Sequence, residues 1–247
     1  MAKEGQLTKD KFGYDMPVDA PLYSKPPIYY KNSEAISLTY ETDESAVSEM
    51  LPEGLGVPSP PTATLMLARY NFSTLGPYEE AILAVSCTWQ GEPRIYIAHI
   101  VVNTDPPMAG GREVWGFPKK FAAITLQMED DLIWGTMDRP TGNRICTGVM
   151  RPEVPVNLEE AEQITVPALS LRVIPSPEEG APPSLMELVE VPLKSTTLEA
   201  WAGPGFVQYH STSNFDPWHK ISVKNMLNAT YRRYDQILGY GKIIKRY

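Results

Sequence analysis

Residues 81–102 have the sequence AILAVSCTWQGEPRIYIAHIVV, and this stretch carries the pattern that decides the fold class. Two apolar runs rich in β-branched and aromatic residues, 81–89 and 95–102, flank the turn segment Gln90-Gly91-Glu92-Pro93. Runs of this length with turn residues between them are typical of consecutive antiparallel strands. The stretch therefore predicts two neighbouring strands of a meander.

Similar segments occur on both sides of this pair. Apolar and polar residues alternate over 36–40, which predicts a half-buried strand. A short helix should follow, because Thr42 or Asp43 can cap it and Pro52 would end it. Further strands are expected at residues 64–72, 121–128, 132–137, 144–150, 169–174, 185–190 and 205–210. So many strands without β–α–β alternation indicate a mainly β fold (α+β), an antiparallel barrel or sandwich with a few peripheral helices.

The length of 247 residues and the hydrophobic content of 43% fit one large domain with a sizeable core. Residues 1–31 are polar and proline-bearing, and we expect an extended arm that lies on the domain or on a neighbouring subunit. Residues 32–247 should form the single domain. The Pro-, Glu- and Gly-rich stretch 175–184 is expected to be a surface loop, because strand-like segments resume on both sides of it.

Charge and composition exclude several classes of function. The net charge of −8 disfavours nucleic acid and anionic membranes as partners. Cys87 and Cys146 are too few for a disulfide scaffold, so we expect reduced, buried thiols. His99, His210 and His219 show no metal-ligand spacing, and no metal or other cofactor is expected. The signatures of serine hydrolases, P-loop enzymes and dinucleotide-binding enzymes are absent from the sequence. The sequence has no signal peptide or apolar membrane span, so a soluble, cytoplasmic protein is expected.

Residues 110–121, GGREVWGFPKKF, carry the candidate chemistry. Lys119 and Lys120 stand between aromatic residues, directly before a predicted strand and after a glycine-rich loop, a context that favours burial. A lysine amine is nucleophilic only when neutral, and both desolvation and a nearby like charge lower its pKa. Both influences are available to Lys119. Successive residues of a strand point to opposite faces, so only one of the two amines should enter a pocket.

Three motifs in combination resemble the acetoacetate decarboxylase family. They are Gly-Arg-Glu at 111–113 followed by aromatic-Pro-Lys-Lys at 117–120, STLGPYEE at 73–80, and EAWAGP at 199–204. The resemblance extends from about Pro26 to the C-terminus. It implies a cone-like antiparallel β-barrel with surrounding sheets and a few helices, a homo-oligomer, and catalysis through a lysine imine. It places Lys119 as the imine-forming lysine, Lys120 as its charged neighbour and Glu80 as the acidic group of the pocket.

The sequence also departs from this family. An ungapped count puts Ser33 where the decarboxylases carry an arginine, and Leu65 where they carry a second glutamate. Some relatives resemble pyruvate-using aldolase-dehydratases, whose tyrosines match Tyr78 and Tyr240 here. Those relatives carry a glutamine where this chain has Trp115, so the sequence fits neither branch fully.

The predicted activity is that of a lysine-dependent carbon–carbon lyase acting on a small keto acid. The lost polar groups favour aldol chemistry with dehydration, using an aldehyde as co-substrate, over decarboxylation of acetoacetate. A binding protein that has lost turnover is the third possibility. Arg112 could clamp a substrate carboxylate or form a structural salt bridge with Glu113 or another acid. Trp115 should shape and dry the pocket, whereas Tyr78 and Tyr240 could bind substrate or serve only in packing.

Overall fold

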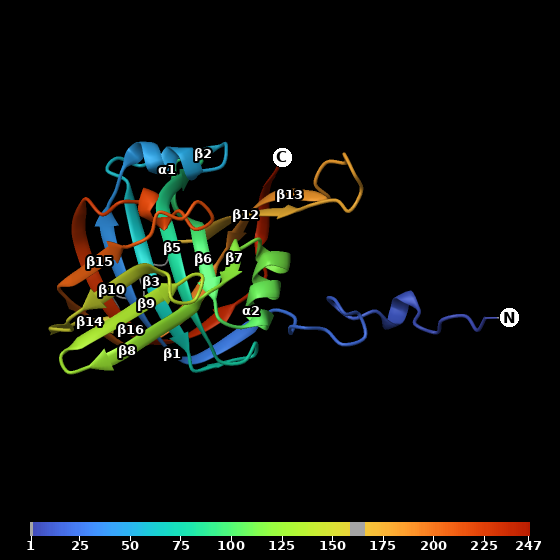
Figure 1. Cartoon of the computed structure of the whole chain (residues 1–247), viewed down its shortest axis with the longest axis horizontal. Coiled ribbons are helices and arrows are strands. Elements are labelled where there is room, and N and C mark those ends of the chain that lie inside the picture. Colours follow the sequence, from blue (N-terminus) through green and yellow to red (C-terminus); the bar gives the residue numbers. More distant parts are fainter. Residues whose placement is uncertain (1, 159–165) are drawn as a thin grey trace.

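The computed structural model describes residues 2–158 and 166–247, and antiparallel strands make up most of them (Figure 1). The mainly β class predicted from the sequence is confirmed. Within these residues the strands form one sheet of 13 strands and one of four. The large sheet follows the order β11 (Val154–Pro155), β14 (Leu193–Gly203), β16 (Asn225–Leu238), β1 (Ile28–Glu41), β3 (Thr62–Tyr70), β5 (Tyr78–Trp89), β6 (Glu92–Val102), β12 (Ala168–Ile174), β13 (Leu185–Val191) and β17 (Lys242–Arg246).

Shorter elements complete the architecture. Three short strands pair with the large sheet: β2 (Leu55–Gly56) with β5, β4 (Phe72–Ser73) with β1, and β7 (Lys119–Phe121) with β6. The four-stranded sheet has the order β15 (Gly205–Tyr209), β10 (Arg144–Met150), β9 (Leu132–Asp138) and β8 (Ala123–Glu129). The helical elements are η1 (Lys9–Lys11), α1 (Glu44–Met50), α2 (Asp105–Gly110), the π-helical turn η2 (Gly111–Trp115) and η3 (Trp218–Lys220).

The hairpin predicted from residues 81–102 is present as β5 and β6, which pair from Glu80↔Val102 to Trp89↔Glu92. Its turn residues Gln90 and Gly91 have φ of 52° and 86°. Positive φ at both central positions gives the turn the twist that matches antiparallel strands. The two runs of apolar residues therefore form adjacent strands near the middle of the large sheet.

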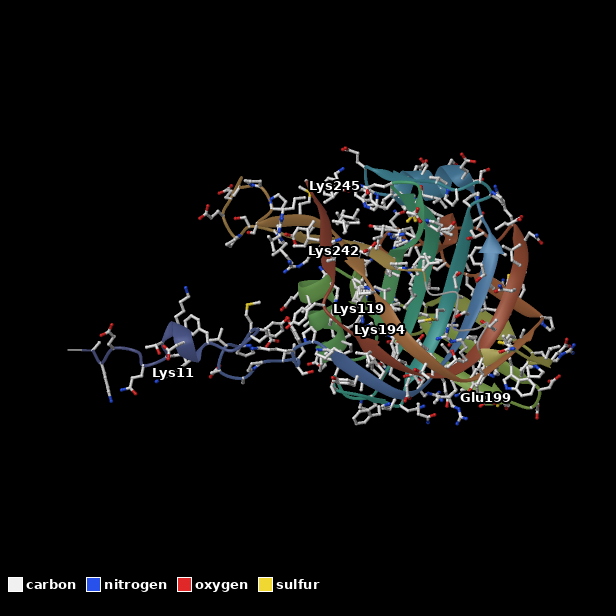
Figure 2. All side chains as sticks on the ribbon, turned by 180° about the vertical axis from the view of Figure 1, so that it is seen from behind. Lys11, Lys119, Lys194, Glu199, Lys242 and Lys245 are labelled. Atoms are coloured by element: carbon white, nitrogen blue, oxygen red, sulfur yellow. The ribbon has the colours of Figure 1, made fainter. Side chains whose placement is uncertain are left out.

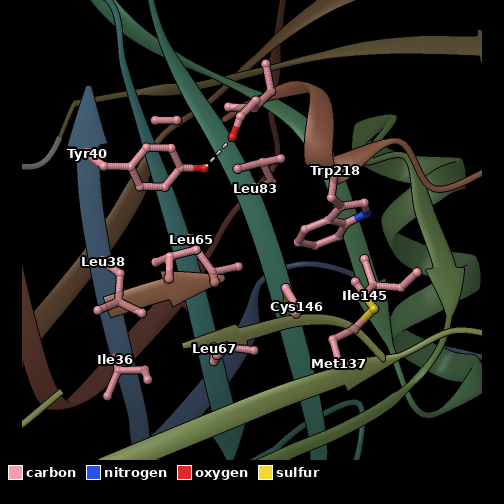
Figure 3. Close-up of a cluster of buried hydrophobic side chains, with 14 of the residues drawn as sticks. Ile36, Leu38, Tyr40, Leu65, Leu67, Leu83, Met137, Ile145, Cys146 and Trp218 are labelled. Atoms are coloured by element: carbon pink, nitrogen blue, oxygen red, sulfur yellow. Dashed lines mark hydrogen bonds between the residues drawn. The ribbon is translucent and has the colours of Figure 1, made fainter. Parts of the chain in front are cut away.

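The two faces of the large sheet carry different clusters. One face packs against the four-stranded sheet, where Leu38, Leu65 and Leu83 meet Met137 and Ile145 (Figure 3). The opposite face, called the inner face below, carries a second buried cluster rich in aromatic residues, including Tyr30, Tyr70, Tyr78, Trp115, Phe117 and Tyr234. Strand alternation explains this division, because successive residues point to opposite faces.

The closed cone that the family resemblance implies is corrected to an open sheet in the described residues. The outer edge of β6 is divided between two short parallel pairings, with β12 at Ile95 and Tyr96 and with β7 from Ile100 to Val102. The path of hydrogen-bonded neighbours ends at β11 on one side and at β17 on the other. A split edge of this kind lets β12, β13 and β17 diverge from the main sheet (Figure 1).

The helix cap predicted at Thr42 or Asp43 is present at the start of α1. Asp43 caps this helix, accepting hydrogen bonds from the backbone N–H groups of Ser45 at 3.0 Å and Ala46 at 3.4 Å. The glycine-rich segment before Lys119, expected as a loop, is instead helical, since α2 has Pro106 and Pro107 in its first turn and η2 continues it. Proline suits the first turn of a helix because the N–H groups there have no intrahelical acceptor.

The arm predicted over residues 1–31 ends earlier in the structure, because residues 28–31 already belong to β1. Most of residues 2–27 extends away from the body of the domain (Figure 1). Hydrogen bonds hold the last part of the arm in place. The Tyr23 hydroxyl donates to Glu113 Oε2 at 2.7 Å, and Asp15 Oδ2 accepts from the backbone N–H groups of Leu22 and Tyr23. Phe12 and Met16 are exposed.

Other expectations from the sequence have direct counterparts. Cys87 and Cys146 are free and buried, and burial raises the pKa of each thiol to about 12. The stretch 175–184 connects β12 and β13 as a loop. Across residues 2–158 and 166–247, none of the helices has the length and apolar character needed to cross a bilayer.

Candidate active site

Lys119 and Glu80 form a buried ion pair on the inner face. Lys119 Nζ lies 2.7 Å from Glu80 Oε2, and their side chains are only 6% and 5% exposed. Glu80 belongs to β5, and Lys119 is the first residue of β7, where it pairs with Ile100 of β6. Figure 2 places Lys119 within the body of the domain. Two residues 39 positions apart are thus joined because β7 adds in parallel to β6, next to β5.

Gly111 makes room for the lysine. A Cβ atom at this position would lie 2.6 Å from Lys119 Cδ and 2.7 Å from Cε, closer than side chains can pack. The Gly111 carbonyl also accepts a hydrogen bond from the backbone N–H of Phe117 at 3.0 Å. Gly116, with φ of 75°, packs against the backbone of Arg172. Glycine at these two positions lets the chain turn from η2 into β7 with Lys119 pointing inward.

Tyrosine hydroxyls and aromatic rings surround the pair. Tyr70 donates a hydrogen bond from its hydroxyl to Glu80 Oε1 at 2.9 Å, and the Tyr78 hydroxyl donates to that of Tyr30 at 3.2 Å. Lys119 Nζ lies 5.5 Å from the centre of the Tyr78 ring and 5.9 Å from that of Phe117. These rings desolvate the pair while leaving the ammonium in favourable cation–π contact.

Burial holds the surrounding tyrosines in their neutral form. Burial raises the pKa of Tyr70 and of Tyr78 well above the usual value, and the negative charge of Glu80 adds to the rise. Burial also raises the pKa of Tyr234 to about 12, an effect that the neighbouring Tyr70 partly offsets. At neutral pH these hydroxyls can therefore donate hydrogen bonds but do not act as anionic bases.

Lys120 points to the other side of the strand. Its Nζ lies 3.1 Å from Asp216 Oδ1 and also donates to the Phe215 carbonyl. Asp216 is buried and pairs with Arg139 at 3.0 Å. The two adjacent lysines thus diverge as strand alternation predicts. Lys120, the predicted charged neighbour of Lys119, thus has its own carboxylate partner in Asp216.

The four other predicted site residues do not all gather around Lys119. Tyr78 does, as described above. Trp115 is buried behind the site, where its indole N–H donates to the Gly239 carbonyl at 2.8 Å and its ring stacks on Phe117. Arg112 is exposed and donates to the backbone carbonyl of Lys119 at 3.1 Å, so it steadies β7. Tyr240 is 57% exposed and lies outside the aromatic cluster around Lys119, where it lines a separate groove with Tyr14 and Tyr23.

Leu65 and Ser33, the two positions where the sequence departs from the family pattern, lie on opposite faces of the large sheet. Leu65 is fully buried between the two sheets, on the face opposite Glu80 (Figure 3). Leu65 therefore does not face the pocket, and the loss of a pocket carboxylate that the ungapped count predicted has no counterpart at this position. Met66, its neighbour, packs on the inner-face cluster instead. Ser33 is fully buried opposite Tyr234, and its Oγ has no hydrogen-bond partner among the described residues.

A groove borders the site on its outer side. It has a volume of about 390 Å³, and Arg112, Phe117 and Leu171 are among its lining residues. Lys119 does not line this groove, but Phe117 does, and its ring also contacts the ammonium of Lys119. Phe117 therefore borders both the groove and the buried pair.

No group of three His, Cys, Asp or Glu side chains suited to a metal ion occurs among residues 2–158 and 166–247.

His99 stacks on Trp218 with ring centres 5.8 Å apart. Burial lowers the pKa of His99 to about 4, and the positive charge of Lys120 adds to the effect.

Sequence reasoning missed Tyr30, Tyr70, Phe117 and Tyr234 as parts of the site. Only Phe117 had a local signal, because it belongs to the aromatic-Pro-Lys-Lys motif. The three tyrosines lie on β1, β3 and β16, and they meet Glu80 only through the register of these strands with β5. That register is not visible in any one segment of the chain.

Comparisons with known proteins identify the class and the family to which this fold belongs. The fold, a large open β-sheet with a smaller sheet packed on it, is that of the acetoacetate decarboxylase-like class of proteins. The family model for acetoacetate decarboxylase (ADC) matches residues 15–247. The chain belongs to the acetoacetate decarboxylase family and is an enzyme of a lyase family.

Three relatives illustrate the match. Decarboxylase DEC1 of Cochliobolus heterostrophus is 32% identical over 240 residues, which cover 94% of both chains. Acetoacetate decarboxylase of Burkholderia mallei is 31% identical over 248 residues, covering 99% of this chain and 98% of the other. The crystal structure of acetoacetate decarboxylase from Legionella pneumophila superposes with a TM-score of 0.89 at 26% identity, covering 100% and 98% of the two chains.

A more distant structure shares the fold alone. The enduracididine biosynthesis enzyme MppR, complexed with the condensation product of pyruvate and imidazole 4-carboxaldehyde, has a TM-score of 0.79 at 18% identity. The match covers 94% of this chain and 96% of that one.

Proposed function

We propose that this protein decarboxylates a β-keto acid through an imine on Lys119. The observation that carries the proposal is the buried contact of 2.7 Å between Lys119 and Glu80, surrounded by neutral tyrosines and aromatic rings. Curated relatives that match nearly the whole chain at 29–32% identity are named decarboxylases, which supports this reaction.

The reaction begins with proton transfer from the Lys119 ammonium to Glu80. The neutral amine adds to the ketone carbon to give a carbinolamine, and protonated Glu80 then supplies the proton with which water leaves. The resulting iminium accepts the electron pair of the carbon–carbon bond to the carboxylate, so that carbon dioxide departs and an enamine remains. Protonation of the enamine carbon and addition of water release the ketone and restore Lys119.

The surroundings of the pair suit this chemistry. Carbon dioxide leaves as a neutral molecule, so the negative charge of the reacting carboxylate disappears as its bond breaks. An apolar site disfavours the charged ground state relative to a transition state in which that charge is dispersed. The rings of Tyr78 and Phe117 supply such an environment beside Lys119 Nζ.

Aldol condensation with dehydration, which the sequence ranked first, becomes the second candidate. Two observations reduce its support. Tyr240, one of its matching tyrosines, is exposed, and Leu65 lies on the wrong face to signal a lost pocket carboxylate. Tyr78 remains beside Lys119 and is the observation in favour of this alternative. A keto-acid binding protein without turnover is the third candidate.

One experiment separates these candidates. The protein is incubated with acetoacetate or with pyruvate plus an aldehyde, and carbon dioxide, condensation product and borohydride-trapped adduct are each measured. Decarboxylation predicts carbon dioxide release and an adduct on Lys119, both lost in Lys119→Ala. Lys120→Ala is the matched control and should keep the adduct, because that amine pairs with Asp216. A condensation product without carbon dioxide would favour the aldolase, an adduct without either product would favour the binding protein, and no adduct would refute the imine.

A further inference from the structure

The inner face carries a second long basic side chain, Arg232, beyond the lysine–glutamate pair. Its guanidinium carbon lies 4.9 Å from the centre of the Tyr234 ring, and Nη2 is 3.4 Å from Ser195 Oγ. In the part of the chain that the structure describes, no carboxylate lies within ion-pair distance of Arg232. The neighbouring Arg233 points to the opposite face, where it pairs with Glu199 at 3.1 Å.

Strand register places Arg232 in the same row as Glu80. Glu80 is opposite Ala68, Ala68 is opposite Ala35, and Ala35 is opposite Arg232. Residues paired in this way lie on the same face of a sheet. Only two alanine side chains therefore separate the buried carboxylate from the guanidinium in this row. Three steps of about 4.8 Å between strands put the Cα atoms of Glu80 and Arg232 about 14 Å apart along the sheet.

A second observation independently points to a ligand at this position. Ser33 lies in the adjacent row, opposite Tyr234, and is fully buried. Its Oγ is buried without a hydrogen-bond partner among the described residues. A buried hydroxyl without a partner is costly, so such groups are usually satisfied. A bulge between Tyr30 and Ser33, with Asn32 at φ of 51°, directs the serine to this face.

We infer that Arg232, assisted by Ser33, binds an anionic group at the end of the substrate away from the reacting carboxylate. This inference rests on the proposed decarboxylation at Lys119. The substrate class is then a β-keto acid that carries a second carboxylate several bonds beyond the ketone. Guanidinium groups bind carboxylates with two parallel hydrogen bonds, and Ser33 supplies one further donor.

The spacing explains why the reacting carboxylate is not the group that Arg232 holds. In a β-keto acid this carboxylate is attached one carbon from the carbon that forms the imine. Arg232 stands three strands from Glu80, whose carboxylate contacts the imine-forming amine. A strong ion pair with the reacting carboxylate would also stabilise the ground state, which slows its loss.

The test compares substrates that differ only at the far end. Acetoacetate, 3-oxoadipate and its distal monomethyl ester are assayed with the wild type and with Arg232→Gln, Arg232→Lys, Ser33→Ala and Arg233→Gln. The wild type should prefer 3-oxoadipate over the ester and over acetoacetate in kcat/KM. Arg232→Gln should reduce kcat/KM for 3-oxoadipate at least about tenfold more than for acetoacetate, the loss expected for a charged hydrogen bond. Arg232→Lys should recover part of this difference, Ser33→Ala should lose less, and Arg233→Gln should match the wild type.

Binding of adipate, which cannot form an imine, separates this inference from the decarboxylase proposal. Calorimetric titration should show adipate binding that weakens about tenfold or more in Arg232→Gln and is retained in Arg233→Gln. If no keto acid is decarboxylated but adipate behaves in this way, the decarboxylase proposal fails and the anion site stands. Three outcomes would each overturn the inference. They are equal losses of kcat/KM for 3-oxoadipate and acetoacetate in Arg232→Gln, no preference of the wild type for the diacid, and adipate binding of unchanged affinity in Arg232→Gln.

Discussion

The two carboxylate oxygens of Glu80 have different partners. One oxygen contacts Lys119 Nζ at 2.7 Å, and the other accepts the Tyr70 hydroxyl at 2.9 Å. A buried charge is stabilised only by such partners, and losing one leaves the remaining charge uncompensated. The sequence indicated Lys119 and Glu80 through their motifs, but Tyr70 belongs to another strand and has no signal of its own.

Replacing Tyr70 with phenylalanine should therefore lower turnover while the ring packing is kept. A hydrogen bond to a charged group contributes about 1.5–3 kcal/mol, so kcat for acetoacetate should fall about tenfold or more. Tyr78→Phe is the control, because that hydroxyl reaches Tyr30 and not Glu80, and a smaller loss is expected. Equal losses in the two variants would contradict the special role given to the Glu80 contact.

His99 should make the fold sensitive to acid. Burial lowers the pKa of His99 to about 4, whereas the unfolded chain has a value near 6.5. Between these values the unfolded state takes up a proton that the folded state resists, so stability falls as the pH drops from about 6.5 to 4 and levels off below that. The difference between the folded and unfolded pKa values of His99 corresponds to about 3 kcal/mol of unfolding free energy.

Urea unfolding at pH 7, 5.5 and 4, at one protein concentration, measures this effect. His99→Gln should reduce the loss of unfolding free energy between pH 7 and pH 4 by about 3 kcal/mol. His210→Gln, at an exposed position, is the control and should retain the wild-type pH dependence. The same pH dependence in His99→Gln and the wild type would show that another group is responsible.

At the scale of elements, the sequence indicated those segments whose structure is determined locally. The β5–β6 hairpin has its turn residues, α1 has its cap at Asp43, and β10 has the predicted bounds 144–150. The strand β16 was missed because charged and amide side chains such as Arg232 and Gln236 fall on its inner face, which hides the apolar period. Its position between β14 and β1 depends on long-range pairing. The same dependence on register explains why the sequence alone could not show that Leu65 faces away from Glu80.

The turn from η2 into β7 provides a prediction for an element. Gly111→Ala should move the Lys119 side chain, because the new Cβ would lie 2.6 Å from Cδ. We expect this variant to fold, and we expect borohydride labelling of its Lys119 to fall about tenfold or more. A tenfold change in rate requires only a small change in activation free energy. Gly110→Ala is the adjacent control, since its Cβ would meet the Tyr23 ring at 3.1 Å and not the lysine. Similar labelling of both variants would show that the close approach does not position Lys119.

At the scale of the molecule, the arm is the feature that the domain itself does not explain. Tyr23 is tied to Glu113, and the Tyr14 ring packs edge-on against Tyr23 at 5.8 Å. Before this point, Leu7 and Phe12 are about half exposed. Apolar side chains on an extended segment gain little from their own chain and much from a neighbouring surface. We therefore predict that the arm carries the association into a homo-oligomer that is expected from the sequence.

Removing residues 1–13 should weaken association without unfolding the domain. The cut precedes Tyr14, so the contacts of Asp15 and Tyr23 that fasten the arm are kept. We expect the full chain to sediment as an oligomer, and the shortened chain to show a smaller mass at the same concentration with unchanged circular dichroism and Lys119 labelling. Phe12→Ser should shift the mass in the same direction, whereas Phe206→Ser, which removes an equally exposed ring on β15, should not. A full chain that sediments as a sharp monomer at working concentration would refute the assembly, and an oligomer that survives the deletion would place its interface on the domain.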